Sequence, residues 1–167
     1  MGLFSVETGA QTLTITATGQ IPASCGLGSG SGFINANLDA NGSLSATATV
    51  NCNTKYLLRA TSANGGLKTA TLAPSASFSS KLDYQFDISV PLDNSSGSVS
   101  GGCVASKLTA GGSDCALSPA GAGLSSVNGT STGKTATLGI SWMLPGATHL
   151  VAGSYADTIT ISIAAQP

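Results

Sequence analysis

The sequence contains very little charge. Only 8% of its 167 residues are Asp, Glu, Lys or Arg, compared with about 25% in an average soluble domain. Six basic and seven acidic residues give a net charge of −1, and they are scattered singly along the chain. Nucleic acids and anionic membrane surfaces are recognised by clusters of basic side chains. We therefore expect no nucleic-acid partner.

Residues that commonly perform catalysis or bind metals are also scarce. His149 is the single histidine, and the cysteines form no Cys-x-x-Cys pair, so the ligand spacing of zinc sites is missing. Asp83 and Asp87 lie four residues apart on one face of an expected strand, roughly 13 Å from each other. Glycoside hydrolysis needs carboxylates about 5–9.5 Å apart. We predict no enzyme activity, no metal, no cofactor and no catalytic role for His149.

Long apolar runs are absent as well. None approaches the ~20 residues that cross a bilayer, so no membrane insertion is expected. The first ten residues, MGLFSVETGA, lack the basic start and apolar core of a secretory signal. Either a signal has been removed or the chain is cytosolic, and the cysteines bear on that choice.

The four cysteines are even in number. They permit three pairings, and their short separations favour Cys25–Cys52 and Cys103–Cys115. Each bridge is typically worth about 2–4 kcal/mol. Four free thiols are the alternative, but an even count in a chain rich in Ser, Thr and Gly points to an oxidising compartment. The sequence therefore predicts a secreted protein.

Strand patterns fill most of the chain, whose length suits one domain. Apolar and polar residues alternate with a period of two, and Gly, Asn and Ser turns separate the segments, which is typical of an antiparallel β-sandwich. Trp142 and Tyr155 fit the apolar face of their strands better than a sugar-binding platform. The expected strands cover residues 44–52, 55–61, 67–73, 82–92, 134–144 and 154–164.

Residues 93–133 are different because they are rich in Gly and Ser and show little periodicity. A stretch of this length is too long for a simple hairpin loop. We interpret it as a surface insert held by Cys103–Cys115, with one short strand near 122–128. A binding loop is the alternative, although the insert lacks the aromatic and charged residues of most binding sites.

Residues 11–21, QTLTITATGQI, read as a strand with one apolar face and no charge. The large residues of that face stand at its ends and the small ones lie between them. Such a strand suits a sheet but adds little to the core of its own domain. The apolar face comprises Leu13, Ile15, Ala17, Gly19 and Ile21.

The segment VAGSYADTITISI, residues 151–163, resembles the C-terminal signature of the spore coat protein U family. That family includes the subunits of archaic chaperone–usher pili and typically ends in Gly-x-Tyr-x-Asp-Thr followed by alternating apolar residues. The stretch GISWMLPG matches the family's penultimate strand and turn, and the Cys25 and Cys52 regions resemble its first disulfide. The motif residues are Gly153, Tyr155, Asp157 and Thr158, followed by Ile159, Ile161 and Ile163.

The resemblance implies an all-β fold, namely an incomplete immunoglobulin-like antiparallel sandwich. A neighbouring subunit's N-terminal strand would complete it, which is strand addition between chains. Residues 1–21 would then be the tail and donor strand, and 22–167 the pilin-like domain. The alternating Ile159, Ile161 and Ile163 would form the edge of the acceptor groove, since no further strand follows them in the sequence.

The resemblance also implies partners and location. It predicts a homopolymer of identical subunits on the cell surface, serving adhesion and biofilm formation. A periplasmic chaperone and an outer-membrane usher would act during assembly. The alternative functions are a secreted monomeric carbohydrate-binding sandwich, with residues 11–21 folded back as its own strand, or a spore or cell-surface coat protein.

Overall fold

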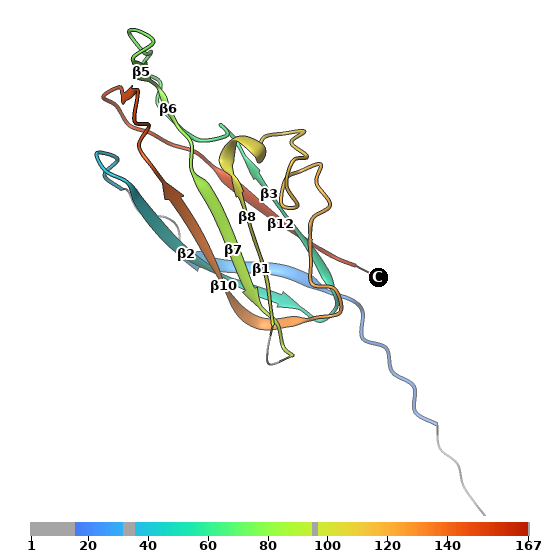
Figure 1. Cartoon of the computed structure of the whole chain (residues 1–167). Helices are drawn as coiled ribbons and strands as arrows, with labels where there is room; N and C mark the ends of the chain where they lie inside the picture. The colour runs from blue at the N-terminus through green and yellow to red at the C-terminus, as the bar shows by residue number, and fades with distance from the viewer. Residues whose placement is uncertain (1–15, 32–35, 95–96, 167) are drawn as a thin grey trace, which may run out of the picture.

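The computed structural model describes residues 16–31, 36–94 and 97–166, and over these ranges the protein is all-β (Figure 1). Within the described part of the chain the helical content is one 3₁₀ turn, η1 (Ala105–Lys107). The strands are β1 (Cys25–Ser31), β2 (Gly42–Cys52), β3 (Tyr56–Ser62), β4 (Leu67–Lys68), β5 (Phe78–Ser79), β6 (Lys81–Leu82), β7 (Gln85–Pro91), β8 (Ser98–Val104), β9 (Leu124–Ser125), β10 (Ser131–Trp142), β11 (His149–Leu150) and β12 (Ile159–Ala165).

The larger sheet has five strands in the order β1-β2-β10-β7-β8, and every neighbouring pair is antiparallel. Its centre is β10, which pairs with β2 from Ser131 opposite Cys52 to Trp142 opposite Gly42. Gly42 is needed there, because a Cβ at this position would lie 2.6 Å from the Trp142 ring. Alternating residues of β2, β7 and β10 are buried, as a sheet with one covered face requires.

A second, antiparallel sheet has the order β12-β3-β9. Its central strand β3 buries Tyr56, Leu58 and Ala60 in the same core cluster as Val50 and Phe86 of the larger sheet. The two sheets therefore share one apolar core. Two short pairs complete the fold: antiparallel β4–β6 and parallel β5–β11. The β5–β11 pair lies at the end of the molecule opposite the N-terminal segment, residues 16–24 (Figure 1).

Both expected disulfide bonds are present. Cys25–Cys52 joins directly opposed residues of β1 and β2, with the Cα atoms 4.2 Å apart. Cys103–Cys115 joins β8 to the segment that follows η1. Two disulfides are consistent with an extracytoplasmic protein. No helix in the described ranges is long and apolar enough to span a membrane.

The sequence located the long strands well and the short ones poorly. Expected strands over 44–52, 55–61, 82–92 and 134–144 correspond to β2, β3, β7 and β10. The prediction over 67–73 was too long, because β4 ends at Lys68. The last strand begins at Ile159, so Tyr155 precedes it instead of lying in it. Asp83 was placed on the same strand as Asp87, but it lies between β6 and β7.

The interpretation of residues 93–133 as a surface insert was wrong in part. This stretch contains β8, an edge strand of the larger sheet. After β8 it returns to the core, where Leu108 and Leu117 are fully buried. Their carbonyls accept hydrogen bonds from the Ser62 and Ala60 amides of β3, at 2.8 Å in both cases. The segment thus continues the smaller sheet beyond β9, and the short strand expected near 122–128 is β9.

Candidate functional site: an open sheet edge and the N-terminal segment

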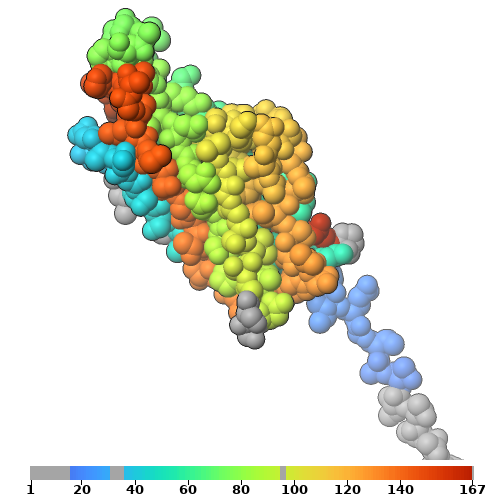
Figure 2. Space-filling model, in the orientation of Figure 1, coloured from blue at the N-terminus to red at the C-terminus, as the bar shows by residue number. Residues whose placement is uncertain are grey.

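The N-terminal segment leaves the body of the protein (Figures 1 and 2). Residues 16–24 are exposed and are not assigned to a strand. The Ile21 side chain is 86% exposed, and a Cβ built on Gly19 would have no atom within 4 Å. Ala17, Gly19 and Ile21 of the predicted donor strand therefore contact little of this chain, while Leu13 and Ile15 lie outside the described residues.

At the other end of the chain, β12 forms an edge of the three-stranded sheet. In the described residues its ladder partner is β3. No other described strand is hydrogen-bonded to β12, so its opposite side is open to pairing, although β1 passes close to β12. Ile159, Ile161 and Ile163 are only partly buried and pack against the core, whereas Thr160 and Ser162 face solvent. An edge strand of low charge is a template for pairing with another strand.

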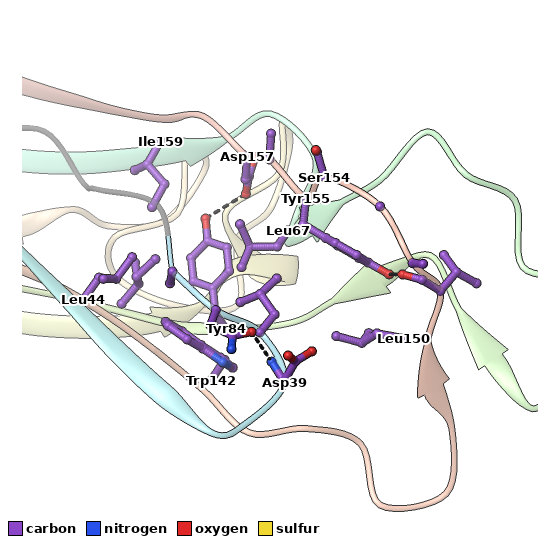
Figure 3. A pocket seen from close by; sticks show the side chains of 18 residues that line it. Asp39, Leu44, Leu67, Tyr84, Trp142, Leu150, Ser154, Tyr155, Asp157 and Ile159 are labelled. Carbon is purple, nitrogen blue, oxygen red and sulfur yellow. Dashed lines mark hydrogen bonds between the residues drawn. The ribbon is translucent and has the colours of Figure 1, made fainter.

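A hollow opens between the start of β12, the start of β2 and the end of β10. Its volume is about 830 Å³. Leu44, Ile140 and Trp142 of the larger sheet line one side, Ile159 of β12 lies on another, and Tyr84 projects into the middle (Figure 3). The hollow therefore lies between the larger sheet and the start of β12.

Asp157 anchors the chain at this hollow. Its carboxylate accepts hydrogen bonds from the hydroxyls of Ser62 (2.5 Å) and Tyr84 (2.7 Å). It also accepts bonds from the backbone amides of Asn64 (3.0 Å) and Thr158 (2.7 Å). The carboxylate thereby connects the start of β12 to the end of β3 and to the segment before β7.

These contacts change the ionisation of both side chains. Burial by itself raises the pKa of Asp157, but the hydrogen bonds from Ser62, Tyr84, Asn64 and Thr158 outweigh it and hold this pKa below its ordinary value. Burial, together with the bond to the Asp157 carboxylate, raises the pKa of Tyr84 far above its ordinary value. The pair is therefore a phenol that donates to a carboxylate at neutral pH.

The other residues of the Gly-x-Tyr-x-Asp-Thr segment, Gly153, Tyr155 and Thr158, make contacts that stabilise the fold. A Cβ on Gly153 would lie 2.5 Å from the Thr69 hydroxyl oxygen, so only glycine fits there. The Tyr155 hydroxyl lies 2.9 Å from the Val151 carbonyl and 3.1 Å from that of Ser79. The Thr158 carbonyl accepts the Ala63 amide at 3.0 Å.

Of the other residues singled out in the sequence, Trp142 lines the hollow, whereas His149, Asp83 and Asp87 do not. His149 is exposed on β11 and contacts the Phe78 ring, with centroids 6.0 Å apart. Asp83 accepts a hydrogen bond from the Ser106 hydroxyl, and Asp87 is exposed on β7. Trp142 is a core residue, 5% exposed, and its indole donates to the Ala40 carbonyl at 3.0 Å.

Sequence reasoning missed the hollow, because its walls come from four separate parts of the chain. The alternating isoleucines of β12 were the single local signal for it. Comparison of the chain with protein-family models, with curated proteins and with solved structures found no match in any of the three.

Proposed function

We propose that the chain is the structural shaft subunit of an extracellular pilus, polymerised by donation of an N-terminal strand to the next subunit. The body is then an incomplete immunoglobulin-like sandwich, and β12 borders the missing strand. The observation that carries this proposal is the open edge of β12, whose three isoleucines are only partly covered. A single strand laid beside β12 would cover these isoleucines and form hydrogen bonds with the backbone groups of the edge.

The N-terminal segment has the properties of the missing strand. It is apolar on one face and uncharged, and its described part extends away from its own body. Large side chains at its ends would fill the gap between the sheets, while Ala17 and Gly19 would let its backbone approach closely. Donor residues 11–21 would pair with the edge of β12 through main-chain hydrogen bonds, and the alternate side chains would give specificity.

The energetic terms favour a durable contact. Burial of Leu13, Ile15 and Ile21 would contribute roughly 1.5–3 kcal/mol each. Each main-chain hydrogen bond would add about 0.5–1.5 kcal/mol net. Because every subunit would both donate and accept a strand, the contact would be head-to-tail and would extend into a fibre.

The resemblance to the spore coat protein U family supports the remaining parts of the proposal. A periplasmic chaperone would cover the open edge before assembly, and an outer-membrane usher would bring subunits together. The finished homopolymer would stand on the cell surface and serve adhesion and biofilm formation.

Size-exclusion chromatography with light scattering tests this function. The purified, oxidised chain is expected to form a ladder of head-to-tail oligomers that grows with concentration. An Ile21→Asp variant, which places a charge at an already exposed position, should keep the monomer folded and abolish the ladder. A wild-type chain that remains monomeric at every concentration would favour the carbohydrate-binding alternative instead.

A further inference from the structure

Asn53 holds the base of the N-terminal segment. Its side-chain oxygen accepts the Ser24 amide at 2.7 Å, and its side-chain nitrogen donates to the Pro22 carbonyl at 3.0 Å. Its backbone amide donates to the Ser24 carbonyl at 3.1 Å. The neighbouring Cys25–Cys52 disulfide fixes the next residue of the segment to β2. Residues 22–25 are thus attached to the turn between β2 and β3.

This attachment lies beside the end of the open edge. Ala165, the last residue of β12, is paired with Tyr56, and the Gln166 amide donates to the Lys55 carbonyl at 2.8 Å. The segment therefore leaves the body close to its own β12 (Figure 1). A short tether of this kind gives an effective concentration in the millimolar range, so the chain's own segment is a strong competitor for its own groove.

For the N-terminal segment to pair with β12 of its own chain, the backbone must turn back between residues 21 and 24. The Asn53 contacts occupy the backbone groups of Pro22 and Ser24, and the proline ring fixes the φ angle of Pro22. Together they keep this stretch in the outward direction. A turn made earlier in the chain would remove Ile21 from the groove.

We infer that Asn53 is a positioning residue for strand donation, which directs residues 16–21 away from their own groove and toward that of a second copy of the chain. This inference rests on the proposed pilus function. Asn53 acts here through Pro22 and Ser24, not through a contact with the acceptor.

Amide hydrogen exchange on the full, oxidised chain at low concentration tests the clamp itself. In the wild type the Ser24 amide should be protected, whereas the Thr18 amide should exchange freely. Asn53→Ala should speed exchange at Ser24 by about tenfold or more, because the side-chain acceptor is lost. Asn53→Asp keeps that acceptor and should keep Ser24 protected. Asn51→Ala, an exposed change on β2, is the matched control and should alter neither amide.

The choice of groove is tested on the same samples. In the Asn53→Ala monomer the edge-facing amides of β12 should gain protection as the chain's own segment folds back, and the yield of oligomers should fall. Fast exchange at Ser24 in the wild type, or an unchanged monomer and oligomer yield in Asn53→Ala, would overturn the inference. A wild-type chain that never polymerises contradicts the pilus function instead, and the Ser24 exchange still decides whether the clamp exists.

Discussion

Asp157 joins three separate parts of the chain at the hollow. Its carboxylate is bonded by residues from the end of β3, from the segment before β7 and from the start of β12. Tyr84, one of these partners, is 3% exposed. A buried hydroxyl that loses its acceptor costs about 1–3 kcal/mol, so the position of β12 depends on this carboxylate.

Replacing Asp157 by Asn should lower the free energy of unfolding at pH 7 by about 1–3 kcal/mol, because an amide cannot accept all of these donors. The pKa of Asp157 is lowered in the folded state. Its contribution is therefore complete above the unfolded value of about 3.9 and is lost as the pH falls through the lower, folded value. Urea unfolding between pH 7 and pH 2 should show the two proteins converging at acid pH. A constant difference across this range would contradict the role given to the charge.

Gly19 and Thr16 give a matched pair of substitutions on the two faces of the proposed donor strand. Gly19→Leu should abolish fibres, because overpacking of the neighbour's groove typically costs about 1–3 kcal/mol. Its own monomer should keep its thermal stability, since a Cβ at Gly19 meets nothing within 4 Å. Thr16→Lys points to the opposite face and should leave fibres intact. Electron micrographs showing normal fibres from the Gly19→Leu protein would contradict the donor assignment.

Some of these residues could be predicted from the sequence and others could not. The spacing of Ile159, Ile161 and Ile163 reveals a strand with one apolar face, because that information is local. The two hydroxyl partners of Asp157, Ser62 and Tyr84, lie more than 70 residues away in the chain, and no periodicity encodes such a contact. Asn53 was missed for the same reason, since its role depends on where Pro22 and Ser24 lie in the fold.

Among the elements, β8 is a strand that the sequence analysis did not predict. Its sequence, SVSGGCV, has two glycines where alternation would be expected. A Cβ on Gly101 would lie 2.8 Å from the Leu124 side chain, and one on Gly102 would lie 1.9 Å from an Asp87 carboxylate oxygen. The glycines are therefore present because neighbours occupy the space above and below the strand. Because glycines stand at these positions, β8 lacks the alternation of apolar and polar residues on which the sequence analysis relied.

The segment between β8 and β9 is a structural part of the smaller sheet, and a core substitution measures this. Leu117 is 1% exposed and its carbonyl bonds to β3, so Leu117→Ala should cost about 2–5 kcal/mol. Leu72 is 86% exposed, and Leu72→Ala should stay within about 0.5 kcal/mol of the wild type. Denaturant unfolding of both variants checks this. If both substitutions changed the free energy of unfolding by equally small amounts, the segment between β8 and β9 would be a surface loop.

At the scale of the whole molecule, the proposed donor and acceptor features lie at positions that suit head-to-tail contact. The N-terminal segment leaves at the end where β12 finishes, and the hollow lies at the end where β12 begins. A contact between two different surfaces of identical subunits extends without closing unless the rotation between subunits forms a ring. This arrangement agrees with a fibre, and the clamp at Asn53 favours donation between subunits.

A structure of the assembled form, determined by electron cryo-microscopy, tests the donation of the strand most directly. We predict that a strand formed by residues 11–21 lies beside β12, with Leu13, Ile15 and Ile21 between the two sheets. Tracing that strand through Pro22 and Ser24 should lead to Cys25 of a neighbouring subunit. A strand that leads back to Cys25 of the same subunit, or a β12 edge that stays empty in the assembly, would contradict strand donation between subunits.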